Sequence, residues 1–520
     1  MEPPGFSEQV VRLKTSIDRL RKGVNEELDN LSAALDKLST ECHNTTENQP
    51  VYKEIHLRKK SDGGSELPEK MFQLRNSRIV DMMANQHLRT VFNMCAAFLF
   101  LVCVILVISY IYDPQRVHED LSTIILNSAG FSTVIGFLLA INFSILFLLR
   151  PSLHLWAQCR TTVKSGLLDG IFLSLLVIYI AVLLAFPAYY SLKHGFPPLS
   201  AAILAFEQVR LIMKLYAYTR ELVKVNKHVL MKETNGTNNI ELKLPEMNSL
   251  LYFLFAPTLV FRESYPRTPN VRWGTVLWYL SNFLGCILLY SVVLNHFIKD
   301  LFRDAGKDDF QLLGFTLTGC SILILGSISL FLMFYGFLHC WLNLFAELLR
   351  FGDRLFYLDW WNSTTYADYY RSWNLVVHDW LFTYVYTDAY KIFNRSKRAA
   401  MLVVFMLSAI VHEYILAVAY GFFFPVILVV FGTLGVGFVF VTKKKTGHVW
   451  NVFLWITLIA GWGIILVFYT VEFYARLNCP QTRGNIADFF LPRSFSWSCH
   501  TFSHSIWFSL PHYRTKIPVP

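Results

Sequence analysis

Charged residues are scarce in this chain of 520 residues. Asp, Glu, Lys and Arg make up 16% of the sequence, whereas hydrophobic residues make up 54% and aromatic residues 16%. Soluble globular proteins carry about 25% charged residues. The composition therefore excludes an ordinary soluble protein and indicates one that crosses a membrane several times. The formal net charge of +10 does not indicate nucleic-acid binding. The basic residues lie beside apolar runs, where such residues set the orientation of the protein and meet anionic lipid headgroups.

Several short motifs with a known chemistry are also missing. His412-Glu413 is not followed by a second His at position 416, which is Leu, so the HExxH pattern of zinc proteases is absent. The sequence has no GxSxG nucleophile elbow and no glycine-rich phosphate loop, and its nine Cys residues contain no CxxC pair. Because the first apolar run begins only near residue 91, we expect no cleavable signal peptide.

Apolar runs dominate the rest of the chain. We predict nine membrane spans, at about residues 91–111, 122–149, 167–187, 199–220, 274–298, 311–347, 399–420, 422–442 and 449–475. Runs of about 20 residues are long enough to cross a hydrocarbon core roughly 30 Å thick. The sequence thus predicts one large membrane domain over residues 91–476, followed by a polar tail over residues 477–520.

Two of the apolar regions are unusual. The run at 199–220 is interrupted by Glu207, Arg210 and Lys214, so this helix should face protein instead of lipid. The stretch 248–268 is apolar but broken by prolines, which remove backbone donors and end helices. We therefore interpret it as a re-entrant or interfacial segment and not as a span.

The N-terminal region is polar and organised differently. Residues 1–41 have apolar side chains at steps of three and four, which make an 11-residue repeat (Leu13, Ile17, Leu20, Val24, Leu28, Leu31, Leu35 and Leu38). A single helix cannot bury such a stripe, so we expect a cytosolic oligomerisation helix. The alternative is an amphipathic helix that lies on the membrane or on the protein itself. Residues 42–90 are expected to be a linker followed by a basic helix along the membrane surface.

The distribution of basic residues predicts the orientation. Loops on one side carry most of them (Arg150, Arg160, Lys164, Arg220, Lys224, Lys391, Arg395, Lys397, Arg398 and Lys443 to Lys445). By the positive-inside rule, the N-terminus and residues 349–398 are cytosolic and the C-terminus is lumenal. Cys479 and Cys499 then lie in an oxidising compartment, where a disulfide between them is plausible. The alternative is two free thiols.

His412 is the sharpest candidate for a reacting group. It lies within the apolar run at 399–420, with Ser408 four residues earlier on the same helix face. Ionisable residues inside a membrane are costly and usually functional, and a neutral imidazole is a general base near pH 7. The alternative is a histidine satisfied by a backbone carbonyl.

A second polar pair precedes it in the chain. Asn374 and His378 are four residues apart, so one helix face offers a carboxamide and an imidazole together. A carboxamide can donate to a developing oxyanion or orient a hydroxyl group. For His378, which lies beside Asp379 and between aromatic residues, a structural role is an open alternative.

These residues resemble a known family. Residues 356–362 are similar to the FYxDWWN signature of the sterol and diacylglycerol branch of the membrane-bound O-acyltransferases. His412 and Asn374 occupy the positions of that family's intramembrane histidine and its partner asparagine. The resemblance is closest to the sterol-acylating members and covers about residues 200–500, through YFLFAPTL (252–259), YPRTP (265–269), FLHCWLN (337–343), WNLVVHDW (373–380) and VHEY (411–414).

The resemblance implies an all-α, polytopic membrane protein with about nine transmembrane helices around an intramembrane reaction chamber. It implies transfer of a long-chain fatty acyl group from acyl-CoA to the 3β-hydroxyl of cholesterol, in the endoplasmic reticulum membrane, by a homo-oligomer. His412 would be the general base and Asn374 would hold the hydroxyl or the thioester carbonyl. Ser408 would assist, and His378 and Trp373 would line the same chamber. Acyl-CoA is a substrate here, and no cofactor is expected.

The resemblance also points to residues for binding the CoA head near the cytosolic face. They are Tyr357, Trp360, Asn362, Tyr386, Lys391, Arg395, Lys397 and Arg398. Arg is favoured for phosphate, although each basic residue in this set is equally well explained as an ordinary orientation signal.

Two other functions remain open on the sequence alone. A diacylglycerol acyltransferase shares the signature and the histidine, but the NST at 362–364, the YPRTP stretch and the two tail cysteines are features of the sterol branch. The other is a non-enzymatic sterol or lipid transporter, in which His412 gates or senses protons.

Overall fold

The computed structural model describes residues 14–15, 23, 58–59, 67, 69–162, 166–233, 245–303, 305, 312–479, 481 and 484–494. The chain divides into two units, Met1–Met71 and Phe72–Pro520. In the first unit, β1 (Arg58–Lys59) pairs with β2 (Glu69–Lys70) in antiparallel register, with Arg58 opposite Lys70. Residues 14–15 and 23 are helical, but the rest of the predicted oligomerisation helix lies outside the described residues and stays a prediction.

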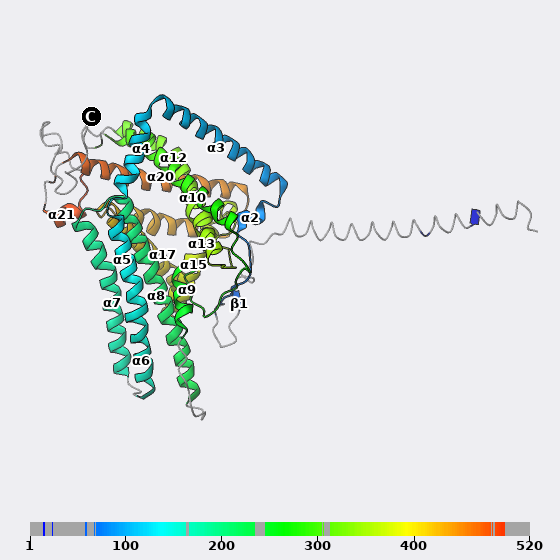
Figure 1. Ribbon diagram of the computed structural model, residues 1–520, viewed down its shortest axis with the longest axis vertical. Helices are drawn as coiled ribbons and strands as arrows, with labels where there is room; N and C mark the ends of the chain where they lie inside the picture. The colour runs from blue at the N-terminus through cyan, green and yellow to red at the C-terminus, as the bar shows by residue number, and fades with distance from the viewer. Residues whose placement is uncertain are drawn as a thin grey trace, which may run out of the picture. The chain divides into compact units, whose positions relative to one another are not determined.

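The second unit is helical from Arg78 onward. Its first helices are α2 (Arg78–Met82), α3 (Gln86–Tyr112), α4 (Pro114–Asn127), α5 (Phe131–Ser144), η2 (Ile145–Leu149), α6 (Arg150–Thr162), α7 (Gly166–Lys193) and α8 (Pro198–Glu233). Asn85 begins α3, because its side chain accepts a hydrogen bond from the His87 amide at 2.9 Å. Asp113 caps α4 in the same way, and Pro114 occupies the first position of that helix. Figure 1 shows α5 and α6 in line with each other, with α7 and α8 running alongside them, while α3 has no buried residue.

The middle of the chain carries shorter and more irregular helices. They are α9 (Met247–Phe255), α10 (Trp273–Val293), η3 (Leu294–Ile298), α11 (Lys299–Phe302), α12 (Leu312–Met333), η4 (Phe334–Trp341), α13 (Leu342–Leu348), η5 (Trp360–Asn362), α14 (Tyr366–Trp373), α15 (Leu375–Trp380), η6 (Leu381–Tyr386) and α16 (Thr387–Ile392). The last part comprises α17 (Lys397–Tyr420), α18 (Val426–Val429), η7 (Val430–Gly435), α19 (Val436–Val441), α20 (His448–Asn478) and α21 (Asn485–Phe490).

Seven helices of the described chain are long and apolar enough to cross a membrane. They are Gln86–Tyr112, Asp120–Arg160, Gly166–Lys193, Trp273–Phe302, Thr316–Leu348, Lys397–Tyr420 and His448–Asn478. The predicted count of nine included two more. One of these, α8, carries the charged residues noted above, and the other is reduced to the shorter apolar helix Val426–Val441. Residues 422–425 are not helical, so this part of the predicted span at 422–442 is wrong.

Charged residues of α8 face protein, as the sequence predicted. Lys214 is 1% exposed, and its ammonium donates to the carbonyls of Phe253 at 2.5 Å and Ala256 at 2.7 Å. Arg210 donates to the Leu254 carbonyl at 2.7 Å and to the Glu207 carboxylate. Lys214 and Arg210 therefore bind the carbonyls at the end of α9 that have no hydrogen-bond partner within that helix.

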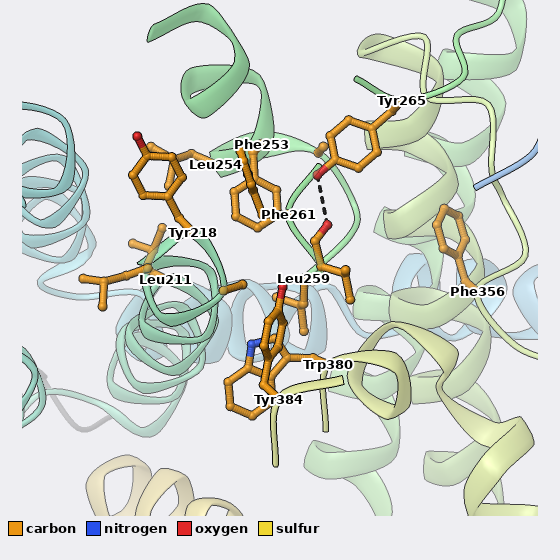
Figure 2. Packing of buried hydrophobic residues seen from close by; sticks show 14 of the residues in the cluster. Leu211, Tyr218, Phe253, Leu254, Leu259, Phe261, Tyr265, Phe356, Trp380 and Tyr384 are labelled. Carbon is orange, nitrogen blue, oxygen red and sulfur yellow. Dashed lines mark hydrogen bonds between the residues drawn. The ribbon is translucent and has the colours of Figure 1, made fainter. Parts of the chain in front are cut away.

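The segment predicted to be re-entrant or interfacial is not a span. It forms the short helix α9, which ends at Phe255, followed by irregular chain up to α10. Figure 2 shows Phe253 and Phe261 packed in the main core, with the Tyr265 hydroxyl donating to the Val260 carbonyl at 2.9 Å. These contacts hold a non-helical loop inside the protein.

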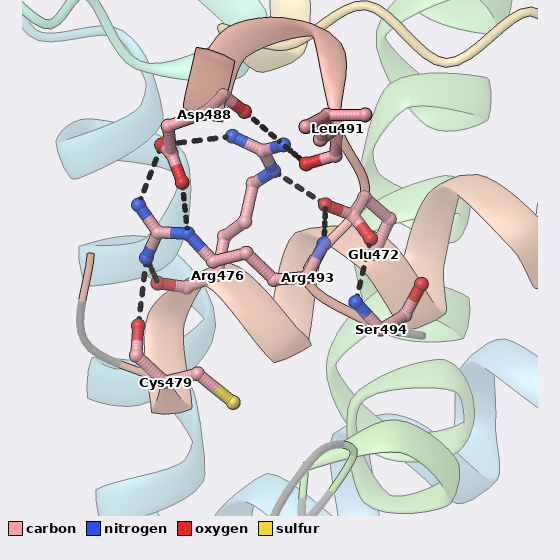
Figure 3. Close-up of polar contacts among 7 residues, drawn as sticks. All are labelled: Glu472, Arg476, Cys479, Asp488, Leu491, Arg493 and Ser494. Atoms are coloured by element: carbon pink, nitrogen blue, oxygen red, sulfur yellow. Dashed lines mark hydrogen bonds and ion pairs between the residues drawn. The ribbon is translucent and has the colours of Figure 1, made fainter. Parts of the chain in front are cut away.

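A charged network closes the C-terminal end of α20 (Figure 3). The Glu472 carboxylate is buried and accepts from Arg476 at 2.5 Å and from the backbone amide of Arg493 at 2.9 Å. Arg493 in turn donates twice to Asp488, at 2.8 and 2.7 Å, and to the Cys479 carbonyl at 2.7 Å. Residues 484–494 are thereby fixed against α20.

Candidate active site

Three aromatic residues of the signature at residues 356–362, Phe356, Tyr357 and Trp360, are buried in the protein core. Tyr357 and Trp360 are 0% and 1% exposed. The Trp360 ring lies edge-on to Trp373, with ring centroids 4.6 Å apart, and to Phe334 at 5.1 Å. Trp373 also contacts Phe334 at 5.3 Å. These rings come from three separate segments, so the signature joins η4 to the end of α14.

Burial changes the interpretation of two predicted acyl-CoA contacts. The Tyr357 hydroxyl lies 2.9 Å from the Ser77 hydroxyl and 2.6 Å from Nδ1 of His339, and all three residues are buried. Burial raises the pKa of Tyr357, so its hydroxyl stays protonated. Tyr357 and Trp360 are enclosed by protein, so they pack against neighbouring residues and do not line an open surface. By contrast, Asn362 at the end of η5 is exposed.

The signature backbone holds Asn374 from both sides. The Leu358 amide donates to the Ser372 carbonyl at 2.9 Å, and the Leu375 amide donates to the Phe356 carbonyl at 2.8 Å. Asn374 lies between these two bonds in an extended conformation and is the N-cap of α15.

The oxygen of the Asn374 carboxamide has a structural role. Its Oδ1 atom accepts from the Val377 amide at 3.1 Å, as an N-cap does. Its Nδ2 group has no hydrogen-bond partner among the described residues, and the side chain is half-buried. The geometry therefore leaves a carboxamide donor whose position is fixed by its own oxygen.

His378 begins a row of flat side chains along one helix face. The segments α15, η6 and α16 follow one another without a break, and His378, Phe382, Tyr386 and Tyr390 are spaced four residues apart. Successive ring centroids are 6.3, 5.3 and 6.1 Å apart, and the last two pairs are stacked. Nδ1 of His378 lies 3.9 Å from Oδ1 of Asp379. The structure thus brings the predicted residues His378 and Tyr386 onto one surface.

This row ends at exposed basic residues. Lys391 lies in the last turn of α16, and Arg395, Lys397 and Arg398 follow before or at the start of α17; all four side chains are exposed. Asn394 and Arg395 have positive φ angles of 47° and 63°, which turn the chain sharply between the two helices. The predicted basic set therefore lies at the turn between α16 and α17, with its side chains exposed.

His412 has a defined tautomer. Its Nδ1 atom lies 2.7 Å from the Ser408 carbonyl oxygen. A carbonyl can only accept, so Nδ1 carries the proton and Nε2 of the neutral ring keeps its lone pair. Nε2 has no partner among the described residues, and the His412 side chain is exposed although it lies well inside α17. The anticipated backbone carbonyl is present, and it leaves the second nitrogen available as a base.

Ser408 contributes mainly through its backbone. Its hydroxyl is 3.5 Å from Nδ1 of His412, at the limit of a hydrogen bond, whereas its carbonyl is at 2.7 Å. Since any residue at position 408 offers that carbonyl, the predicted assistance by the hydroxyl is weakly supported by this geometry.

Aromatic contacts connect His412 to the segment that carries Asn374. The His412 ring lies 6.1 Å from Phe431 of η7, and Phe431 lies 5.1 Å from Tyr370 of α14. A Cβ at Gly435 would lie only 2.6 Å from the Tyr370 hydroxyl, so this position requires glycine. Sequence reasoning missed these three residues; the cluster of glycines at 432, 435 and 437 was the available signal for a close approach.

The helix of His412 also packs on the helix of His378, since α17 contacts both η6 and α16. His412, Asn374 and His378 thus lie on adjoining segments. Three π-helical stretches, η4, η6 and η7, carry or flank the site residues, and such stretches are frequent at functional sites. In the described parts of the chain, no group of three or more His, Cys, Asp or Glu is arranged to hold a metal ion.

Comparison with known proteins agrees with this site. The chain matches the membrane-bound O-acyltransferase family over residues 182–471. It is 40% identical over 439 residues to sterol O-acyltransferase 1 of Mus musculus, covering 83% of this chain and 79% of that protein. It is 38% identical over 435 residues to sterol O-acyltransferase 2 of Homo sapiens, covering 83% of this chain and 81% of that protein.

The chain belongs to the membrane-bound O-acyltransferase family. It is therefore a multi-pass membrane acyltransferase, and the predicted resemblance is confirmed. In an O-acyltransferase, a base must reach the acceptor hydroxyl and a donor must reach the thioester oxygen. Nε2 of His412 and Nδ2 of Asn374 offer one group of each kind.

Glu413 anchors the neighbouring part of this acyltransferase helix. Its buried carboxylate accepts from the Tyr469 hydroxyl and from the Leu428 amide, the latter at 3.1 Å. The Phe424 carbonyl lies 2.8 Å from the same hydroxyl and is an alternative acceptor for its one proton. These bonds tie α17 to α20 and to the start of α18, which limits how far His412 can rotate.

The predicted tail disulfide is described on one side only. Cys479 is disulfide-bonded, whereas Cys499 lies outside the described residues. Their pairing stays a prediction.

Proposed function

We propose that this enzyme transfers a long-chain fatty acyl group from acyl-CoA to the 3β-hydroxyl of cholesterol, forming a cholesteryl ester and CoA. The observation that carries the proposal is the His412 tautomer: Nδ1 donates to the Ser408 carbonyl, and Nε2 of this exposed residue keeps its lone pair. The similarity to sterol O-acyltransferases of mouse and human over 83% of the chain supports the choice of a sterol acceptor.

The reaction needs one proton transfer in each direction. Nε2 of His412 takes the proton of the sterol hydroxyl while the hydroxyl oxygen attacks the thioester carbon. The carbon–sulfur bond breaks, and the CoA thiolate leaves and takes up the proton from His412. The Nδ2 group of Asn374 donates to the thioester oxygen as negative charge develops there. The thioester is already activated, so no acyl-enzyme and no cofactor are required.

Acyl-CoA enters from the side on which the basic residues lie. Lys391, Arg395 and Arg398 are exposed and suit the phosphates of the CoA head. His378 and Tyr386 lie on the helix face between this corner and Asn374. Cholesterol is nearly insoluble in water and reaches His412 from the bilayer.

We further infer a location in the endoplasmic reticulum membrane, with a cytosolic N-terminus and a lumenal C-terminus. The distribution of basic residues supports this orientation, and the disulfide at Cys479 agrees with a lumenal tail. The apolar repeat in residues 1–41 supports assembly as a homo-oligomer, a dimer or a dimer of dimers.

The decisive experiment is an acceptor assay on purified membranes. Labelled acyl-CoA is supplied with either cholesterol or diacylglycerol, and both the ester and the released CoA thiol are measured, with His412→Ala membranes as the background. We expect ester on cholesterol with an equal amount of CoA. Ester on diacylglycerol alone would reassign the acceptor, and sterol movement without CoA release would identify a transporter.

A further inference from the structure

Residues 72–81 precede the first long helix and are bound to the segment that contains the signature. We call these residues the strap. The Arg75 amide donates to the Gly352 carbonyl and the Arg354 amide donates to the Arg75 carbonyl, both at 3.0 Å. Arg75 and Asp353 thereby form a parallel bridge between segments that are 278 residues apart. The expected basic helix along the membrane surface is wrong for residues 71–77, which are not helical; helix α2 begins only at Arg78.

Two bidentate ion pairs fix the strap. One is to Asp353, just before the signature, and the other is to Asp359, within it. The Arg75 guanidinium donates to the Asp353 carboxylate at 3.0 and 2.7 Å. The Arg78 guanidinium donates to the Asp359 carboxylate twice at 2.6 Å. Bidentate arginine–carboxylate pairs add directional constraint as well as energy. The four side chains are between 2% and 26% exposed, so these pairs are shielded more than ordinary surface pairs.

The strap also makes close contacts with the signature, with residue 352 and with the loop after α9. Ser77 is 1% exposed, and its hydroxyl lies 2.9 Å from the Tyr357 hydroxyl. Phe72 lies edge-on to Tyr265, with centroids 5.1 Å apart. A Cβ at Gly352 would lie 3.2 Å from Leu74 and 2.9 Å from the Pro266 carbonyl, so the strap, residue 352 and the loop after α9 are packed closely.

The signature passes this constraint on to Asn374. Tyr357 is held by the strap, and its neighbours Phe356 and Leu358 make the two backbone bonds on either side of Asn374. A shift of the signature backbone therefore moves the carboxamide that faces the reacting thioester in the proposed mechanism. A misplacement of about 1 Å at a reacting group can cost about 100-fold in rate.

We propose that residues 72–81 are a positioning strap for the acyl transfer, with Arg75, Ser77 and Arg78 as positioning residues that act through the signature on Asn374. This proposal rests on the proposed function for its kinetic effect.

The kinetic test is a double-mutant cycle in the full-length enzyme. Arg75→Gln/Arg78→Gln is compared with wild type, and the same pair of changes is compared in the Asn374→Asp background. We expect kcat to fall about tenfold or more in the first comparison with little change in the KM for acyl-CoA, and to fall much less in the second. An equal loss in both backgrounds, or no loss in the first, would overturn the proposal.

A control and a second readout separate this role from general destabilisation. Arg160→Gln breaks an ion pair between α6 and α7, in which Arg160 is 26% exposed and Asp169 is 41% exposed, and we expect it to leave kcat unchanged. Hydrogen–deuterium exchange at Leu358 and Leu375 should rise in the strap variant and not in Arg160→Gln. This measurement needs no activity, so it still tests the strap if the acceptor assay contradicts the proposed function. If the double variant is not recovered from membranes, Arg78→Lys is used in both tests, and unchanged kcat and exchange in it would contradict the proposal.

Discussion

The signature region and the middle of α17 both carry residues that sequence reasoning marked as functional, but their surroundings are opposite. Tyr357 and Trp360 are both buried; the Tyr357 hydroxyl is hydrogen-bonded to Nδ1 of His339, and the Trp360 ring packs against Trp373. His412 is exposed and has one close hydrogen bond, to a carbonyl of its own helix. The longer motif thus builds the framework, while the single histidine is left open to react. A conspicuous motif is therefore no guide to which side chain touches the substrate.

The largest effect should follow from removing the open imidazole. His412→Ala deletes the base and should lower ester formation by about 100-fold or more, with normal protein levels because residue 412 is exposed. Ser408→Ala keeps the carbonyl that orients His412 and should cost only a few-fold. Rates are measured in membranes and normalised to enzyme content. A His412→Ala enzyme with near wild-type activity would refute the assignment of the base.

Asn374 belongs to both regions, so its two roles can be separated by substitution. Asn374→Asp keeps the acceptor that caps α15 but loses the donor to the thioester oxygen, and we expect a loss of about 100-fold in kcat with unchanged thermal stability. Asn374→Ala should lose activity and about 1 kcal/mol of stability as well. If Asn374→Asp is active, the residue is a cap and not a catalytic donor.

The buried signature should respond through stability and not through substrate affinity. Trp360→Ala removes a ring packed against Trp373 and Phe334 and should cost about 3–5 kcal/mol. Tyr357→Phe leaves Ser77 and His339 without their shared partner and should cost about 1–3 kcal/mol. Thermal unfolding in detergent measures both. An increase in the KM for acyl-CoA with unchanged stability would show that these side chains do contact the substrate.

The exposed basic corner should give the smallest effect. Lys391→Gln and Arg395→Gln should each raise the KM for acyl-CoA a few-fold and leave kcat unchanged, because they attract the CoA phosphates before the chemistry occurs. The difference from wild type should shrink at high salt, since exposed charges are screened. An effect on kcat that persists in high salt would place these residues nearer to the reacting atoms.

The sequence allowed the helical membrane fold and the family to be predicted, and the physical reasons are particular. Long apolar runs predict helices by themselves, and an imidazole at position 412 is costly enough to stand out. Lys214 was expected to face protein, and it does. Family resemblance then supplied Asn374 and the signature.

Other features depend on contacts between distant residues and leave little trace in the sequence. The strap joins residues about 280 positions apart, and its two arginines look like ordinary orientation signals. The π-helical stretches change the direction of side chains without changing composition. Residues 422–425 are apolar and were counted within a span, although Gly421 ends α17 in a left-handed conformation, with φ 76°, just before them.

The ion pairs of the strap also set an order of events during synthesis. Arg75 and Arg78 are made 278 and 281 residues before Asp353 and Asp359. At about 5–20 residues per second, this interval lasts on the order of tens of seconds. During that time most of the long helices are made, while neither arginine has its carboxylate partner. A ribosome-bound chain stopped before residue 353 would therefore lack both of these ion pairs, and the site can assemble only in the last third of translation.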